Sequence, residues 1–189
     1  MPIYRAKMKH SEDTIKKLVQ TQYDTFQFGR KLLNTVIAFG LILFGLYADQ
    51  SMFMPLIALF VGCILLANLN AVPRMRAREV LQQMGGKFPR SDYSFLEKGF
   101  KFYDKGELLP YSSLIRLVED RQYLYLYVSE QSAYMVDKGT VTGGSVDDLK
   151  TFLKIETGLT WNRPASLLSF KLKDVFQKKE TEYQGPRLK

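Results

Sequence analysis

Cysteine and histidine are each present only once in the 189 residues, and their scarcity excludes several kinds of site. A single cysteine, Cys63, leaves no disulfide framework, thiolate zinc site or paired-cysteine redox centre. A single histidine, His10, leaves no imidazole triad and no histidine-rich metal site. A phosphate loop is also missing, because no Gly-Lys-Ser/Thr follows Gly139, Gly143 and Gly144. We therefore expect a non-enzymatic protein with no cofactor, no metal and no small-molecule substrate.

Charge is missing from two long apolar runs, residues 32–48 and 52–69, which are separated by only three residues. At 17 and 18 residues, each run is at the lower end of what crosses a hydrocarbon core of about 30 Å. The ten Leu, Ile, Val or Phe residues in each run contribute roughly −3 to −6 kcal/mol to membrane insertion. Burial in a soluble domain is the alternative, which this length without charge disfavours. The runs predict a transmembrane hairpin, with Ser51 capping the second helix and Pro55 in its first turn.

Basic residues flank the hairpin on its outer sides: Arg30 and Lys31 precede it, and Arg74, Arg76 and Arg78 follow it. The turn between the runs has one Asp and no Lys or Arg. Because cations favour cytoplasmic loops, we expect both termini in the cytoplasm and these five side chains near lipid headgroups. The net charge of +8 divides into +4 before the hairpin, −1 in the turn and +5 from residue 70 onward. Because the three arginines fan around a helix, nucleic-acid binding is not expected.

Small residues lie at four positions of the hairpin: Gly40 and Gly45 in the first run, and Ala58 and Gly62 in the second. Such residues let helices approach closely. Two interpretations stay open, since the four residues either pack the two helices of one hairpin together or mediate self-association between chains. Neither run contains an ionisable acid or base of the kind that lines an ion pathway, so a channel or transporter is not expected.

Two helical segments border the hairpin, and the first of them is amphipathic. Residues 11–28 have a helical period, with Ser11 as the N-cap, and their apolar stripe consists of Ile15, Leu18, Val19, Tyr23 and Phe26. This stripe either rests in the lipid interface or packs on a cytoplasmic domain. Residues 2–8 are expected to form a short strand. After the hairpin, Pro73 begins a helix that ends at Gly85.

The pattern changes to a period of two from residue 92 onward, as in β-strands. Alternating segments are separated by turn residues and predict an antiparallel meander, with Pro110 at an edge or a break. A helix closes the meander. Ser145 is its N-cap, its buried stripe includes Leu149 and Leu153, and Gly158 ends it.

Two surfaces are candidates for partner binding. One is a row of tyrosines on a single face of the strand at 123–128, which is a binding surface, a half-buried sheet face or a face under the following helix: Tyr123, Tyr125 and Tyr127. The other is a basic amphipathic helix within residues 159–189. It either docks on the sheet, touches the inner leaflet with Trp161 as an anchor, or offers its apolar stripe to a partner. That stripe includes Leu168, Leu172 and Phe176.

The segments 99–120 (GFKFYDKGELLPYSSLIRLVED), 123–127 (YLYLY) and 134–138 (YMVDK), together with the capped helix, resemble the YcxB-like family of bacterial membrane proteins. The resemblance covers nearly the full length to about residue 158. It implies an N-terminal strand and helix, a two-span hairpin and a cytoplasmic domain similar to pleckstrin-homology modules. It supplies no catalytic residue to carry over.

The expected fold class is therefore an α+β membrane protein, with a transmembrane hairpin and a small antiparallel sheet closed by a helix. It has five parts: an N-terminal strand and helix (1–31), the hairpin (32–69), a juxtamembrane helix and linker (70–90), the β domain (91–158), and a basic helix with a polar tail (159–189).

Three functions fit this layout. The first is an adaptor or regulatory subunit in the bacterial inner membrane, which contacts another membrane protein, or a second copy of itself, through its spans or its domain. The second is a self-immunity protein against a membrane-active bacteriocin or toxin. The third is a module that binds anionic lipid through its basic residues. In each of them membrane lipids are partners.

Overall fold

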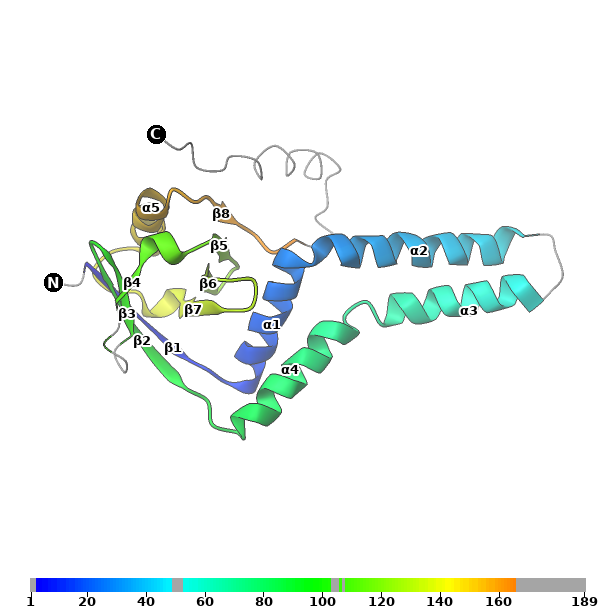
Figure 1. The fold of residues 1–189 in the computed structure, drawn as a ribbon, viewed down its shortest axis with the longest axis horizontal. Coiled ribbons are helices and arrows are strands. Elements are labelled where there is room, and N and C mark those ends of the chain that lie inside the picture. Colours follow the sequence, from blue (N-terminus) through cyan, green and yellow to red (C-terminus); the bar gives the residue numbers. More distant parts are fainter. Residues whose placement is uncertain (1–2, 49–52, 103–105, 107, 166–189) are drawn as a thin grey trace.

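The computed structural model describes residues 3–48, 53–102, 106 and 108–165, and these residues form an α+β fold. Within them lie five α-helices and two four-stranded sheets. Two helices, α2 (Phe28–Tyr47) and α3 (Phe53–Ala67), run side by side away from the sheets (Figure 1). We call these two helices the helix pair. The sheets and the helix that closes them, α5 (Val146–Thr157), are called the β module.

The first sheet contains a strand from each side of the helix pair in the sequence. Its order is β1 (Tyr4–Lys9), β2 (Arg90–Leu96), β3 (Gly99–Phe102) and β4 (Leu108–Pro110), and all neighbours are antiparallel. Because β1 pairs with β2 along its whole length, the chain leaves the module, forms the helix pair and returns to the same sheet. A division of the chain at residue 91 therefore does not separate the β module from the N-terminal segment.

The second sheet has the order β7 (Ala133–Asp137), β6 (Tyr123–Tyr127), β5 (Arg116–Glu119) and β8 (Trp161–Asn162). The strands therefore form two sheets rather than one meander. The last strand, β8, was not expected from the sequence: it follows α5 and runs parallel to β5. Pro110 is the last residue of the edge strand β4, where its missing N–H is not needed by a neighbour.

The core of the β module lies between the two sheets and beneath α5. Strand alternation brings Phe95, Phe100, Leu124 and Leu126 to zero exposure. Helix α5 begins at a capping box between Ser145 and Asp148, and ends at Gly158, whose φ of 67° is left-handed. The buried side of α5 includes Leu149 and Leu153, as the sequence predicts. This core holds the surfaces of the module in fixed positions.

Helix α1 (Glu12–Phe26) packs on the β module rather than lying free for the lipid interface. Ser11 is its N-cap, in a capping box with Thr14. Ile15 and Val19 are buried, and α4 (Ala71–Met84) packs along the same helix. Of the two positions open for the apolar stripe, packing on the domain is therefore the one observed.

The helix pair is connected to the module through α1 and α4. Helix α2 is 20 residues long and apolar enough to cross a membrane by length and composition. Helix α3 reaches this criterion only together with α4, from which it is bent by 42°. The predicted cap Ser51 lies outside the described residues, whereas Pro55 lies in the first turn of α3 as expected.

Candidate functional site

Apolar side chains cover the outer surface of the helix pair. These side chains are among the most exposed large hydrophobic groups of the described residues: Leu33, Val36, Ile37, Phe39, Leu43, Phe44, Leu46, Phe53, Met54, Leu56, Ile57, Phe60, Val61 and Ile64. So many exposed apolar side chains on two neighbouring helices are unusual on a soluble monomer. The single cysteine, Cys63, is free and is also exposed on α3.

Two of the four small residues hold the helix pair together. A Cβ atom at Gly62 would lie 2.8 Å from the backbone oxygen of Ala38, and one at Gly45 would lie 2.7 Å from the backbone oxygen of Pro55. The helices therefore approach so closely that only glycine fits at these positions. Nothing lies within 4 Å of a Cβ placed at Gly40, and Ala58 is half-buried. Packing within one hairpin thus explains Gly45 and Gly62.

A polar cluster lies where α1, α2 and α4 meet. Lys31 Nζ donates to Asp24 Oδ1 at 2.8 Å, and the two side chains are only 9% and 15% exposed. Gln20 Nε2 donates to the second carboxylate oxygen at 2.8 Å and lies 3.5 Å from Asn70 Oδ1. Lys31 is therefore committed to an ion pair, and the expectation that it is free to contact lipid headgroups is wrong in this structure. The cluster connects the base of the helix pair to α1, which packs on the β module.

The other four predicted cations remain on the surface. Arg30, Arg74, Arg76 and Arg78 are exposed, and their guanidinium groups make no ion pair within the described part of the chain. Their placement near one end of the helix pair follows from their positions at the start of α2 and along α4. The structure thus gathers at this end the cations that the sequence distributes over two separate segments.

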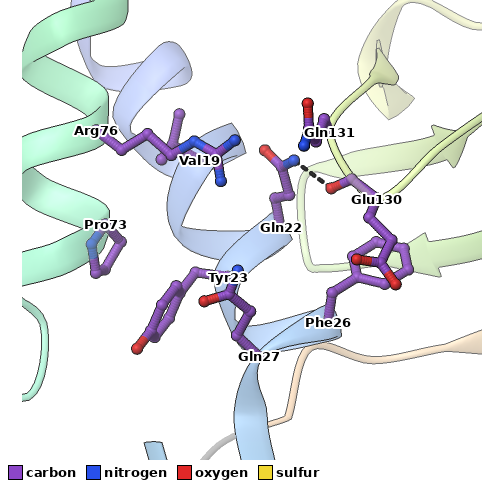
Figure 2. A pocket seen from close by; sticks show the side chains of 9 residues that line it. All are labelled: Val19, Gln22, Tyr23, Phe26, Gln27, Pro73, Arg76, Glu130 and Gln131. Atoms are coloured by element: carbon purple, nitrogen blue, oxygen red, sulfur yellow. Dashed lines mark hydrogen bonds between the residues drawn. The ribbon is translucent and has the colours of Figure 1, made fainter. Parts of the chain in front are cut away.

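Arg76 differs from the other three because it lines a cleft between α1, α4 and the turn that joins β6 to β7 (Figure 2). The cleft measures about 60 Å³ and is lined by Val19, Gln22, Tyr23, Phe26, Gln27, Pro73, Arg76, Glu130 and Gln131. Gln22 closes one side by donating to the backbone oxygen of Glu130. Pockets for metabolites usually measure about 300–1,000 Å³, so this cleft is too small for one.

The tyrosine row lies beneath α1, the helix that precedes the sheet, and not beneath the following helix. Tyr125 and Tyr127 are fully buried, and the ring of Tyr127 lies 5.0 Å from that of Phe26 on α1. Burial raises the pKa of both tyrosines above the usual range. Tyr123 is half-buried, with Lys17 Nζ 4.6 Å from its ring centroid. Tyr125 and Tyr127 are therefore part of the module's interior and do not form an exposed partner surface.

Charged groups at the end of β5 connect this region to α1 and α5. Asp120 accepts from the Tyr125 hydroxyl at 2.8 Å and lies 3.1 Å from Lys17 Nζ. Burial alone would raise the pKa of Asp120, but hydrogen bonds from backbone N–H groups, Tyr125 and Lys17 outweigh it and lower that pKa. Burial alone would also raise the pKa of Glu119. Its ion pairs with Lys138 and Lys150 outweigh this effect and lower that pKa. Both carboxylates serve as structural ion-pair partners.

Trp161 is held by the module rather than by lipid. It lies in β8, and its indole Nε1 donates to the backbone oxygen of Lys150 at 2.9 Å. Three of the predicted partner-surface residues, Leu168, Leu172 and Phe176, lie outside the described residues. Among the described residues, no group of three or more His, Cys, Asp or Glu side chains is placed to hold a metal ion.

Asp24, which accepts from both Lys31 and Gln20 in the polar cluster, was not among the site residues predicted from the sequence. Its signal was a charged pair of opposite sign seven residues apart, at 24 and 31. Seven residues are two helical turns, so the two groups share a face. The bend between α1 and α2 that lets them meet has no comparable signal in the sequence.

The family comparison supports the resemblance found in the sequence. Residues 95–153 match the family described as YcxB-like protein, a segment that runs from the end of β2 into α5. No curated protein and no solved structure matches the chain.

Proposed function

We propose that this chain, with its YcxB-like segment in the β module, is a bacterial inner-membrane protein whose helix pair crosses the bilayer twice. At 1.5 Å per residue, α2 is about 30 Å long, and its uncharged part from Leu32 to Tyr47 rises about 24 Å, close to the lower end of what crosses a hydrocarbon core. The apolar side chains on the outside of both helices support this placement. Exposed cations at one end of the pair favour a cytoplasmic location for both termini.

The second crossing depends on residues beyond α3. That helix has 15 residues and rises only about 22 Å. The apolar run of the sequence extends to residue 69, and a short span is accommodated by local thinning of the bilayer. The helix pair then spans as one unit, because Gly45 and Gly62 join α3 closely to the longer α2.

The proposed role is that of a non-enzymatic adaptor or regulatory subunit that presents the β module to another membrane protein. The observation that carries this proposal is the pairing of β1 with β2 across the helix pair. Because both ends of the pair lead into one sheet, the module is held at the membrane by two connections and the Asp24–Lys31 ion pair. Its two sheets and closing α5 favour a pleckstrin-homology-like arrangement, which is a fold used widely for binding.

Membrane insertion is tested by extraction and by topology. We expect the full chain to stay with membranes in alkaline carbonate and to dissolve only with detergent. A fluorescent protein fused to its C-terminus should fluoresce, whereas an alkaline phosphatase fusion at the same position should be inactive. Release without detergent, or an active phosphatase fusion, would contradict the proposal.

The adaptor role is tested by photo-crosslinking in living cells. A crosslinking amino acid is placed at the outward-facing Leu43 of α2 or at the exposed Ile155 of α5, and the buried Leu153 serves as the control position. We expect a discrete adduct with one membrane protein from at least one of the two exposed positions and none from the control. If both exposed positions gave no protein adduct, the adaptor proposal would fail.

A further inference from the structure

The outer face of α4 combines apolar and basic side chains directly after the helix pair. Met75 and Val72 are 60% and 55% exposed. On a helix with 100° per residue, Arg74 and Arg78 lie along one side of Met75, and Val72 lies on the other side. Pro73 and Ala77, on the opposite face, are buried. The first two turns of α4 therefore present an apolar centre with a basic edge.

The angle between α3 and α4 gives the position of residues 72–78 along the bilayer normal. With a bend of 42° between α3 and α4, each residue of α4 advances about 1.1 Å along the axis of α3. The stretch from Val72 to Arg78 then covers about 7 Å. A headgroup layer is about 5–7 Å thick on each side of the hydrocarbon core. If α3 is in lipid, this stretch lies at headgroup depth, and Gln82 lies beyond it.

Charge supports the same placement. Arg74 and Arg78 are exposed and have no ion-pair partner among the described residues, so their guanidinium groups are available to phosphates. One turn further on, the exposed face becomes polar with Glu79 and Gln82. The apolar and basic character is thus confined to the two turns nearest the helix pair.

We propose that the first two turns of α4 form a binding site for anionic phospholipid in the cytoplasmic leaflet, with Met75 and Val72 between the lipids and Arg74 and Arg78 on their phosphates. This site rests on the proposed membrane insertion. It makes α4 an interfacial support, which fixes the height of the β module above the bilayer. It also makes the attachment sensitive to lipid composition.

Depth is measured with spin labels on the full chain in nanodiscs, after Cys63→Ala removes the native thiol. Labels at Met75→Cys and at Gln82→Cys compare two positions on one face of α4, and a label at Leu43→Cys reports on α2. We expect the label at 43 in hydrocarbon, the label at 75 at headgroup depth and the label at 82 in water. A water-exposed label at 43 would overturn the membrane insertion itself. A label at 75 as water-exposed as the label at 82, with 43 in hydrocarbon, would overturn only the lipid site.

Lipid preference is measured by the ratio of phosphatidylglycerol to phosphatidylcholine retained by the chain from equal mixtures. One arginine near an anionic surface changes this preference about fivefold. We therefore expect Arg74→Gln and Arg78→Gln each to lower the ratio about fivefold. Lys98→Gln, in the turn between β2 and β3 at the far end of the module from the helix pair, removes the same charge and should leave the ratio unchanged (Figure 1). If Arg74→Gln and Arg78→Gln retained phosphatidylglycerol and phosphatidylcholine in the same ratio as Lys98→Gln, the site would be refuted.

Discussion

The ion pair between Asp24 and Lys31 offers the sharpest test of how the helix pair is joined to the β module. Replacing Lys31 by Met keeps the length of the side chain and removes its charge. Asp24 then loses the ammonium group 2.8 Å away and keeps only the hydrogen bond from Gln20. Because this carboxylate lies in a largely buried position, its charge is left poorly compensated.

The expected loss of stability follows from the burial of the pair. Removing one partner of a fully buried ion pair costs about 3–5 kcal/mol. The side chains of Lys31 and Asp24 retain 9% and 15% exposure, and Gln20 still donates to the carboxylate. We therefore expect a loss of about 2–3 kcal/mol for Lys31→Met. Because the double variant Asp24→Leu, Lys31→Met leaves no isolated charge, it should lose less than the single variant.

The only tryptophan, Trp161, provides the assay, because it is attached to β5 and α5 and reports unfolding of the module by fluorescence. Denaturation in detergent micelles is followed for the wild type, the single variant and the double variant. Lys16→Met, which breaks an exposed ion pair with Glu12 on α1, is the matched control and should have no measurable effect. A stabilising role of the buried ion pair is refuted if Lys31→Met lowers stability no more than Lys16→Met, or if the double variant is less stable than Lys31→Met alone.

Three further predictions concern separate parts of the fold. Gly62→Ala should lower the thermal stability of the helix pair in micelles, by roughly 1–3 kcal/mol, whereas Gly40→Ala, which has open space, should raise it by up to about 1 kcal/mol; equal effects would contradict the close helix contact. Burial lowers the pKa of His10, so the unfolded chain binds a proton first, and stability should fall as the pH drops below about 6.5. His10→Gln should flatten that part of the stability profile, and an unchanged slope would exclude His10 as its source. Tyr111→Phe removes a 2.8 Å hydrogen bond to the backbone oxygen of Leu96 and should lower the unfolding free energy by about 0.5–1.5 kcal/mol in chemical denaturation, while a neutral effect would show that water replaces this bond.

Local signals in the sequence predicted the elements well where the cause is local. The N-caps at Ser11 and Ser145 and the C-cap at Gly158 were all found by their side-chain chemistry, because a capping box or a left-handed glycine depends on a few adjacent residues. The period of two predicted strands at the positions of β2, β3, β5, β6 and β7. The YcxB-like resemblance was likewise confirmed over residues 95–153.

The candidate sites were less predictable, because their exposure depends on what packs against them. The sequence left open whether the tyrosine row is a binding surface, a half-buried sheet face or a face under the following helix. In the structure α1, which precedes the helix pair in the sequence, covers Tyr125 and Tyr127. The sequence predicted Lys31 as a cation near lipid headgroups. In the structure the bend after α1 places it against Asp24. Trp161 was a candidate anchor in the inner leaflet, and it lies in an edge strand that runs parallel to β5.

By itself, the sequence determined the chemical character of each segment: two long apolar runs without charge, cations on their outer sides, capped helices and alternating strands. These properties depend on side-chain transfer energies and on hydrogen bonds between near neighbours, which are written into short stretches of sequence. Only the tertiary structure decided that β1 closes a sheet with β2 across the helix pair, and which arginines remain free. It also decided that Gly45 and Gly62, rather than Gly40, each face the other helix of the pair. Such pairings join residues tens of positions apart, and a pattern of period 2 or 3.6 identifies a face without identifying its partner.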